Sequence, residues 1–163
     1  MKKWHILHEQ EVTDQKQMTE NDIVQILLKN RGFIAEKAIE EFLHPSLEKL
    51  TIEKTGIKKQ QLEKAIKRII KAIKEKESIV VYADYDVDGV TSGAILWETL
   101  YGLRAQVMPY IPHRIEEGYG LSKKGIDFIQ KQYNPQLLLT VDSGVSAVKE
   151  ILYAKKLGME TIV

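Results

Sequence analysis

The chain has 163 residues, of which 44% are hydrophobic and 29% are charged, and its formal net charge is +1. This length suits one domain with a small appendage, and the near-zero net charge means that any basic binding surface must be local. The absence of cysteine excludes disulfides, thiolate zinc sites and cysteine nucleophiles, and it is compatible with a reducing cytoplasm. The N-terminal stretch MKKWHILHEQ lacks the apolar run of a signal peptide, and no run of about 18 apolar residues predicts a membrane span. We therefore expect a cytoplasmic protein without a membrane partner.

Residues 1–57 predict a small helical module. Apolar residues recur at helical spacing in two short segments, Ile23, Ile26 and Leu27 in the first and Ile34, Ala38, Ile39, Phe42 and Leu43 in the second. Thr19 is a suitable N-cap for the first helix, which we expect to end at Arg31-Gly32. His44-Pro45 is expected to end the second. The interpretation we favour is a packing appendage.

A longer amphipathic helix is predicted over residues 58–76, connecting this module to the rest of the chain. Its apolar stripe, expected to be buried, consists of Leu62, Ile66, Ile69, Ile70 and Ile73. Between Lys54 and Lys76 there are nine lysines and arginines against two glutamates. Such a run of charges is usually a helix face exposed to solvent, and we favour this interpretation here. The alternative is a surface that binds a nucleic-acid backbone.

Residues 77–163 alternate between strand and helix patterns. The expected strands are 78–84, 105–112, 135–142 and 159–163, and the expected helices are 90–103, 123–132 and 145–158. Buried strands separated by helices form a parallel sheet with helices on its faces, joined by right-handed crossovers. The fold class is therefore α/β, a parallel β-sheet with flanking helices, in which residues 58–163 form one domain. Ligands of such folds bind beyond the carboxyl ends of the strands.

Four aspartates fall at the carboxyl ends of two expected strands. The stretch VVYADYDVDGV places Asp84, Asp86 and Asp88 after the first strand, and LLLTVDSGV places Asp142 after the third. Clustered carboxylates raise one another's pKa unless a cation compensates, so a divalent metal is the natural occupant. Oxygen ligands favour Mg²⁺ or Mn²⁺. We predict Asp86, Asp88 and Asp142 as metal ligands, with Asp84 as a hydrogen-bonding support of the same catalytic cluster.

The aspartates also resemble a calcium-binding loop and a set of helix caps. DYDVDG matches the opening of an EF-hand loop, but Ile95 stands at the twelfth position, where that loop needs a glutamate, and a strand precedes it. Aspartates commonly cap helices, and Asp142 or an aspartate before Val90 would serve in this way. Capping accounts for one carboxylate per helix, not for three within five residues.

Glycines and a hydroxyl near the aspartates suit phosphate binding. Gly89 and Gly144 allow sharp turns, and the stretch DSGVS, which contains Ser143, is expected to open a helix with free N–H groups. With the carboxylates, these residues suggest phosphoryl transfer assisted by two metals.

The stretch IPHRIEEGYGLS after the second strand is a further candidate. Arg114 has a fork of donors that fits a phosphate, and Tyr119 stands beside Gly120 in a loop that would shape a pocket. The alternative for Arg114 is an ordinary contact with Glu116 or Glu117 on the surface.

Three motifs in order resemble those of the DHH phosphoesterase superfamily, namely VVYADYDVDGVTSGAIL, PHRIEEGYGLS and LLLTVDSGVSA. The stretch RGFIAEKAIEEFLHPSLEKL is also similar to the region that precedes them in the RecJ family of single-strand-specific 5′→3′ DNA exonucleases. The resemblance covers nearly the whole chain, and its first motif is highly specific. Other branches carry a histidine at the place of Tyr82, and here Asp84 intervenes, which favours the RecJ family.

This resemblance implies hydrolysis of phosphodiesters by a metal-activated water, with Mn²⁺ or Mg²⁺ as cofactor, releasing nucleotides from the 5′ end of single-stranded DNA in repair and recombination. It implies Asp86, Asp88 and Asp142 as metal ligands, with Asp84 in the same cluster. The substrate-binding residues that it implies are Arg114 and the loop to Leu121, which contains Tyr119 and Gly120. The phosphate-binding pattern described above adds Ser143 and Gly144 to the predicted substrate-binding residues. Single-stranded DNA would be the partner, with a single-strand-binding protein and a helicase as further partners.

The sequence departs from the family pattern after its last strand. The Asp-His-His motif that names the family is expected beyond METIV, where the sequence stops, and the four histidines present do not replace it: His5, His8, His44 and His113. We therefore expect the N-terminal part of such an enzyme, with a weak or empty two-metal site and little activity alone. Two alternatives stay open, a DHH phosphodiesterase of small nucleotides and a non-catalytic scaffold of the same fold.

Overall fold

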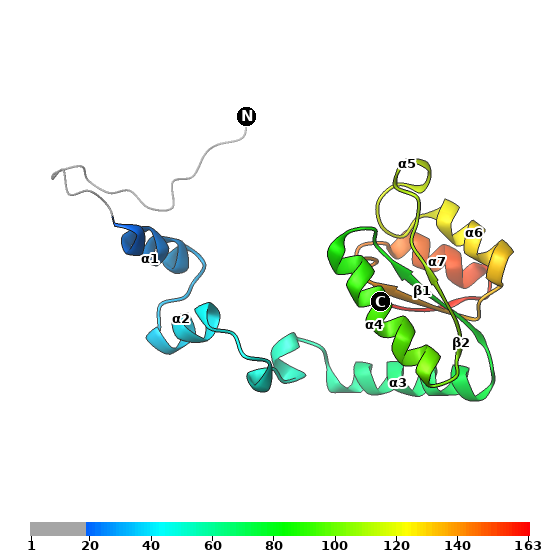
Figure 1. Cartoon of the computed structure of the whole chain (residues 1–163), viewed down its shortest axis with the longest axis horizontal. Helices are drawn as coiled ribbons and strands as arrows, with labels where there is room; N and C mark the ends of the chain where they lie inside the picture. Colours follow the sequence, from blue (N-terminus) through cyan, green and yellow to red (C-terminus); the bar gives the residue numbers. More distant parts are fainter. Residues whose placement is uncertain (1–18) are drawn as a thin grey trace. The chain divides into compact units, whose positions relative to one another are not determined.

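The computed structural model describes residues 19–163 (Figure 1). The stretch MKKWHILHEQ, with His5 and His8, lies outside the described residues. The chain divides into two compact units, with the break after Gly56, and each is described by itself. That the units are separate domains stays a prediction. Among the described residues, no helix is long and apolar enough to cross a membrane.

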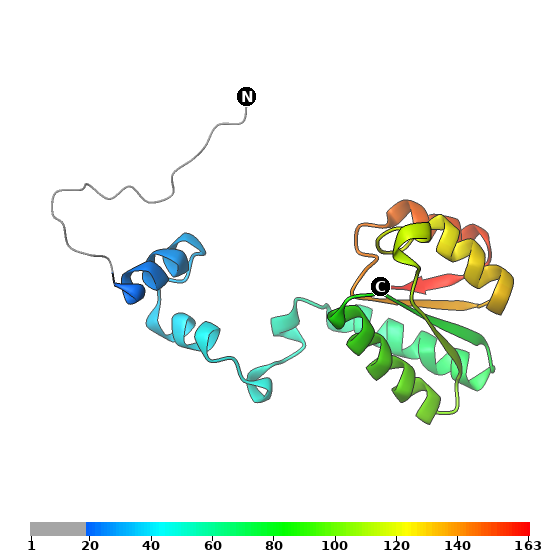
Figure 2. The same cartoon turned by 45° about the horizontal axis from the view of Figure 1, so that its top comes forward.

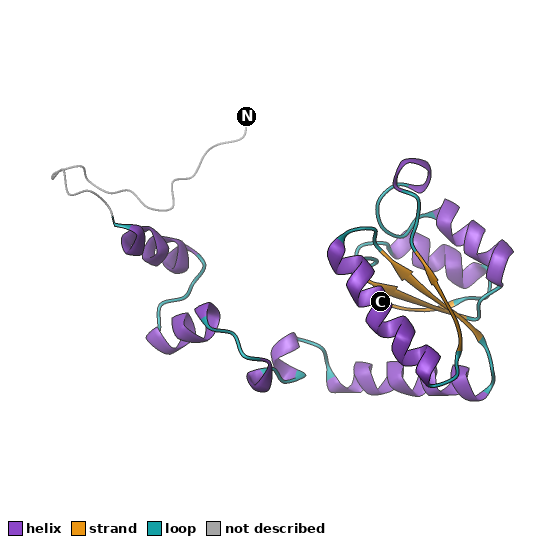
Figure 3. Cartoon of the chain, viewed as in Figure 1, coloured by secondary structure: helices purple, strands orange, loops and turns teal. Residues whose placement is uncertain are grey.

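The first unit contains short helices (Figure 3). Helix α1 spans Glu20–Asn30 and α2 spans Glu36–Leu43, and two short 3₁₀ helices follow, η1 (Leu47–Lys49) and η2 (Glu53–Thr55). Thr19 caps α1 as expected, in a capping box with Asp22. The two helices end at the expected places, with Arg31 and His44 as their C-caps.

The first unit has almost no core of its own. The rings of Phe33 and Phe42 pack with their centroids 4.4 Å apart. Over residues 19–56, however, Leu28 is the only buried apolar side chain. The interpretation of the segment as a packing appendage stays a prediction.

The second unit has three layers. Its helices are α3 (Lys59–Lys74), α4 (Val87–Gly102), α5 (Arg114–Glu117), α6 (Lys123–Tyr133) and α7 (Val148–Lys156). Its strands are β1 (Ser78–Ala83), β2 (Gln106–Tyr110), β3 (Leu137–Val141) and β4 (Glu160–Ile162). All neighbouring strands pair in parallel, in the order β2-β1-β3-β4. The predicted α/β fold with a parallel sheet is confirmed.

The central strands bury both of their faces. From β1, Ile79 and Val81 pack in a cluster with residues of α3 and α4, whereas Val80 and Tyr82 pack with residues of α6 and α7. Figures 1 and 2 show the same arrangement, with these two pairs of helices on opposite sides of the sheet. A strand covered on both sides needs apolar residues at every position, which explains the uninterrupted run in the sequence.

The observed elements differ most from the expected ones in three places. Helix α4 begins at Val87, before the expected Val90, because Asp86 supplies its N-cap. Helix α7 begins at Val148, later than the expected Val145, because residues 144–147 form a turn in which the N–H of Ala147 donates to the oxygen of Gly144 at 2.9 Å. The residues Arg114–Glu117, expected in a loop, form the short helix α5.

The predicted buried stripe of α3 is partly wrong. Ile66 and Ile70 are 46% and 45% exposed, whereas Ala72 is fully buried. The inward face of the helix also carries Arg68, which pairs with Glu77, so the helix is rotated away from the stripe expected from apolar spacing alone.

Candidate metal centre

Asp84 and Asp142 occupy equivalent places on neighbouring strands. Strands β1 and β3 pair with Ala83 opposite Val141, so the next residue on each strand is one of the two aspartates. The chain passes from β1 to β2 on one side and returns to β3 on the other, so the strand order reverses between β1 and β3. Open parallel sheets bind their ligands at such a point.

Asp86 and Asp88 belong to the start of helix α4. Oδ1 of Asp86 accepts a hydrogen bond from the N–H of Gly89 at 2.9 Å, and Asp88 lies in the first turn, where the helix dipole favours an acidic group. Helix capping therefore accounts for Asp86. Asp142 caps no helix, because the N-cap of α7 is Ala147. An EF-hand is excluded because a strand, not a helix, precedes the aspartates.

The carboxylates of Asp84, Asp86 and Asp142 converge, with one oxygen from each within 4.8 Å of the others. Oδ1 of the buried Asp84 accepts a hydrogen bond from the N–H of Tyr85 at 2.7 Å. Its buried Oδ2 has no hydrogen-bond partner among the residues that the structure describes. Desolvation raises the pKa of Asp142, and the negative charges of Asp86, Asp88 and Asp84 raise it further. Within the described part of the chain, no ion pair gives these carboxylates a compensating positive charge.

These features fit a divalent cation. A buried carboxylate oxygen without a partner destabilises the fold unless a cation or a donor satisfies it, and carboxylate oxygens suit Mg²⁺ and Mn²⁺. The expected convergence of Asp86 and Asp142 is confirmed, and Asp84 joins them as a full member of the group. Asp88 stands outside this group in the described structure, yet its charge reaches Asp142. The role of each residue as a ligand stays a proposal.

Glycine is required where α4 meets β1. A Cβ at Gly89 would lie 2.4 Å from the backbone oxygen of Asp84, and a Cβ at Gly93 would lie 2.8 Å from the Cβ of Ala83. The two glycines let the first turns of α4 contact the end of the strand. This close approach holds Asp86 beside Asp84.

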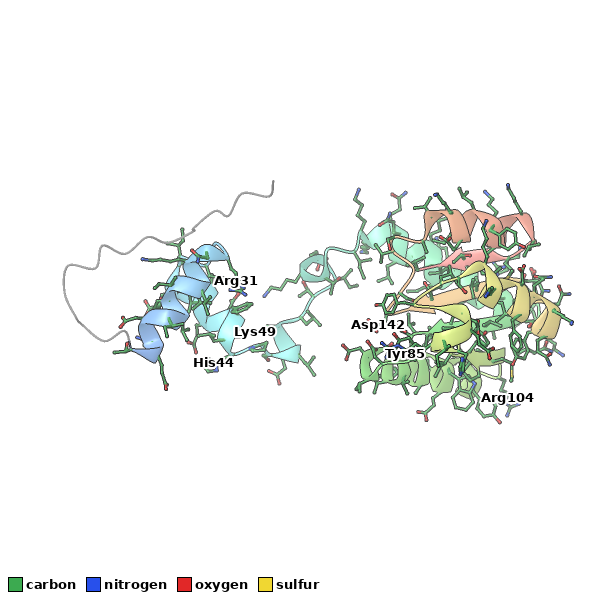
Figure 4. The ribbon with its side chains drawn as sticks, turned by 90° about the horizontal axis from the view of Figure 1, so that it is seen from above. Arg31, His44, Lys49, Tyr85, Arg104 and Asp142 are labelled. Atoms are coloured by element: carbon green, nitrogen blue, oxygen red, sulfur yellow. The ribbon has the colours of Figure 1, made fainter. Side chains whose placement is uncertain are left out.

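Arg114, Tyr85 and Tyr119 form an aromatic and cationic group. The guanidinium carbon of Arg114 lies 5.0 Å from the centroid of the Tyr85 ring, and the rings of Tyr85 and Tyr119 meet edge to face at 6.3 Å. The negative charge of Asp84 raises the pKa of Tyr119, which places this phenol within electrostatic reach of the acidic cluster. Figure 4 shows Tyr85 and Asp142 at the same end of the second unit.

The expected alternative for Arg114 is not observed. Among residues 19–163, ion pairs join Arg68 with Glu77 and Glu160, and Lys71 with Glu75, and none involves Arg114. Its side chain is exposed and stacked on Tyr85, so its N–H donors remain available.

An open pocket of about 700 Å³ adjoins the cluster. Five residues named from the sequence are among those that line it: Tyr119, Gly120, Asp142, Ser143 and Gly144. The expectation that DSGVS opens a helix is wrong, because this stretch forms a turn before α7. The hydroxyl of Thr140 donates to the backbone oxygen of Ser143 at 3.1 Å and shapes that turn.

Sequence reasoning misses one residue of this site and underrates another. Tyr85 was missed because it looks like a spacer between Asp84 and Asp86. An aromatic residue between two carboxylates at the end of a strand could have indicated that it belongs to the site. Asp84 was expected to support the cluster from outside, and the strand pairing that makes it a direct member could not be read from local spacing.

Comparison with known proteins assigns the fold to a family. Residues 78–163 match the DHH family, N-terminal domain, over more than half of the chain. The chain belongs to the DHH family.

The relatives of this chain include bacterial RecJ proteins. The single-stranded-DNA-specific exonuclease RecJ of Bacillus subtilis (strain 168) is 39% identical over 154 residues, which are 93% of this chain and 19% of the relative. The enzyme of the same name from Escherichia coli (strain K12) is 36% identical over 103 residues, 63% of this chain and 18% of the relative. A crystal structure of exonuclease RecJ bound to manganese superposes with a TM-score of 0.58 at 38% identity, covering 63% of this chain and 26% of that one. The chain spans about a fifth of the length of these two curated relatives.

Proposed function

We propose that this chain forms the N-terminal, metal-binding part of an exonuclease that degrades single-stranded DNA from its 5′ end. The observation that carries the proposal is the convergence of Asp84, Asp86 and Asp142 where the strand order reverses. Similarity to RecJ exonucleases over 93% of the chain supports the substrate class. The proposed setting is DNA repair and recombination in the cytoplasm.

The chain's own residues define the metal site of this proposal. Asp84, Asp86 and Asp142 would hold Mn²⁺ or Mg²⁺. Asp88, whose charge acts on Asp142, is proposed as a further ligand. When bound, the metal supplies Lewis-acid polarisation of the phosphodiester and activation of a water. The fold contributes position: the Tyr85 N–H holds Asp84, the helix cap holds Asp86, and the left-handed turn orients Asp142.

The neighbouring group would bind the DNA strand. Arg114 has donors available for a phosphate oxygen, and the ring of Tyr119, which is 71% exposed, offers a face on which a base can stack. Such stacking tolerates any base, which suits an exonuclease without sequence preference. The backbone at Gly120, Ser143 and Gly144 would line the pocket beside the metals.

Single-stranded DNA is the proposed partner of this surface, and a single-strand-binding protein and a helicase are proposed partners of the whole enzyme. The aspartate cluster offers three converging carboxylates without a histidine, so we expect weak metal binding and little nuclease activity from the 163 residues alone.

The test transplants the chain into a relative. The 154 matching residues of the Bacillus subtilis RecJ are replaced by those of this chain, and hydrolysis of 5′-labelled single-stranded DNA is followed with Mn²⁺. We expect a chimera that degrades single-stranded DNA, and a loss of about 100-fold or more on Asp142→Asn, since each ligand of a catalytic metal is needed. A folded chimera whose activity is unchanged by Asp142→Asn, or one that hydrolyses only small cyclic nucleotides, would refute the proposal.

A further inference from the structure

The segment between β2 and α6 is closed on itself by Glu117. Its Oε2 accepts a hydrogen bond from the Tyr110 hydroxyl at 2.5 Å, and its Oε1 accepts one from the backbone N–H of His113 at 3.0 Å. The N–H of Glu117 also donates to the oxygen of His113 at 2.8 Å. One carboxylate thus joins the last residue of the strand to both ends of the short helix α5, and Arg114 lies inside this closed segment.

A second tyrosine holds the other end of the same segment. The hydroxyl of Tyr82 donates to the buried backbone oxygen of Gly120 at 3.1 Å. Tyr82 and Tyr110 are register partners on β1 and β2, and their rings lie 5.2 Å apart. Neighbouring strands therefore present two phenols side by side, one to Glu117 and one to Gly120.

The contact with helix α6 leaves no spare space around these two anchors. A Cβ at Gly125 would lie 2.5 Å from the Tyr82 hydroxyl and 2.9 Å from Oε2 of Glu117. Burial, the hydrogen bond to Glu117 and the charge of Glu117 all raise the pKa of Tyr110, so this phenol stays a donor. The Tyr110–Glu117 and Tyr82–Gly120 hydrogen bonds are therefore each held in place by tight packing against α6.

The anchored segment carries the exposed groups of the proposed DNA surface. Arg114 is held with its guanidinium over Tyr85, whose backbone N–H in turn binds Asp84. The long side chain of an unanchored arginine samples many rotamers, and ordering it on binding lowers affinity. An anchor that fixes its backbone reduces this loss.

We propose that Glu117 and Tyr110 are positioning residues, which hold Arg114 against Tyr85 so that its donors face a phosphate of the bound strand next to the acidic cluster. This assignment rests on the proposed function for the identity of the ligand. The geometric part, that the Tyr110–Glu117 bond sets the place of Arg114, can be measured without any ligand.

The experiment uses the 163-residue chain and the variants Tyr110→Phe, Glu117→Gln and Arg114→Ala. The first readout is the NMR shift of the Arg114 side-chain protons, which the Tyr85 ring displaces upfield. The second is the Kd for a fluorescein-labelled oligo(dT) by anisotropy. We expect Tyr110→Phe and Glu117→Gln each to reduce the ring-current shift and to weaken DNA binding about three- to tenfold, in keeping with the loss of one hydrogen bond. Mn²⁺ binding should be unchanged, because the aspartates stand on other loops.

A double-mutant cycle separates positioning from a general structural role. In the Arg114→Ala background, Tyr110→Phe should have no further effect on DNA binding, since the residue it positions is gone. Glu116→Gln is the matched control, because the Glu116 side chain is exposed and makes no hydrogen bond or ion pair within residues 19–163. It should leave both readouts as in the wild type.

The outcomes are distinguishable. An unchanged Arg114 shift in both variants, or additive losses in the cycle, would overturn the positioning role. A wild-type chain that binds no oligo(dT) would count against the proposed function, and the NMR comparison would still decide whether Tyr110 and Glu117 place Arg114.

Discussion

Asp84 and Asp142 directly follow the paired residues Ala83 and Val141 on adjacent parallel strands, so the pairing of β1 with β3 forces their carboxylates together. Nothing local to either segment brings about this meeting. Desolvation and the charges of the neighbouring aspartates raise the pKa of Asp142, which means that folding works against electrostatic repulsion at this edge of the sheet. A cation would relieve this repulsion.

Replacing Asp142 by asparagine should therefore have opposite effects with and without metal. In metal-free buffer, Asp142→Asn should raise the melting temperature, because one of the mutually repelling charges is removed. Mn²⁺ should raise the melting temperature of the wild type by mass action and that of the variant much less, with affinity reduced about tenfold or more. Differential scanning calorimetry over a series of Mn²⁺ concentrations measures both effects.

The control for this prediction is Glu98→Gln, which removes an exposed carboxylate farther along α4. It should leave the Mn²⁺ response unchanged. Equal stabilisation of wild type and Asp142→Asn by Mn²⁺ would show that the metal binds elsewhere.

Substituting alanine for each of two glycines in α4 should have different effects on the free energy of unfolding. Gly89→Ala places a Cβ 2.4 Å from the backbone oxygen of Asp84, which cannot move without distorting the strand end, so we expect a loss of about 2–3 kcal/mol in the free energy of unfolding. Gly102→Ala meets nothing within 4 Å and should be neutral or gain up to about 1 kcal/mol through helix propensity. Urea unfolding followed by circular dichroism compares the two. Similar values for both variants would mean that the close approach of α4 to β1 is not tight.

The sheet and the site's main residues were predictable because they depend on strong periodic signals. β1 and β3 are apolar at successive positions, which marks strands buried on both faces, and the aspartates stand where those runs stop. The rule that ligands bind at the carboxyl ends of parallel strands then placed Asp86 and Asp142 on one edge. Neither prediction required knowledge of a side-chain conformation.

The remaining features depend on contacts that local spacing does not encode. The direct membership of Asp84 follows from the register of β1 with β3, and the stacking of Arg114 on Tyr85 follows from the path of the β2–α6 segment. Helical spacing also assigned Ile66 to the core, although the ion pair of Arg68 with Glu77 shows that a polar residue lies on the inward face instead. In each of these cases, contacts between segments distant in the sequence determine the position of the residue, and the local sequence pattern does not.

Tyr82→Phe should change the response of the fold to alkaline pH. Burial raises the pKa of Tyr82 to about 12, so above pH 10 this residue ionises in the unfolded chain while it stays neutral in the folded one. Fewer protons bound in the unfolded state mean that stability falls as pH rises, by up to about 1.4 kcal/mol per pH unit between pH 10 and 12. The Tyr82→Phe variant has no phenol at this position, so its stability should not show this fall with pH.

At pH 8 the variant should instead be less stable by about 1 kcal/mol, because the hydrogen bond to the Gly120 oxygen is lost. The difference between the two proteins should therefore shrink and then reverse as pH increases from 8 to 11.5. Urea midpoints measured along that series give the comparison, and parallel curves would contradict the assigned pKa.

The ion pairs of Arg68 should contribute unequally to stability. Arg68 of α3 contacts Glu77, and both side chains are only 16% exposed, whereas its second partner, Glu160 of β4, is 66% exposed. Arg68→Met keeps the apolar stem but leaves the charge of Glu77 shielded from water and unpaired, so we expect a loss of about 2–4 kcal/mol in the free energy of unfolding. Glu160→Gln removes a solvated partner and should lower the free energy of unfolding by about 1 kcal/mol or less.

Adding Glu77→Gln to Arg68→Met should recover most of the stability lost in Arg68→Met, because the penalty arises from the unpaired charge rather than from the missing bond. Chemical denaturation of the four proteins tests this order, and a double variant no more stable than Arg68→Met would show that the arginine stabilises the fold through packing of its stem.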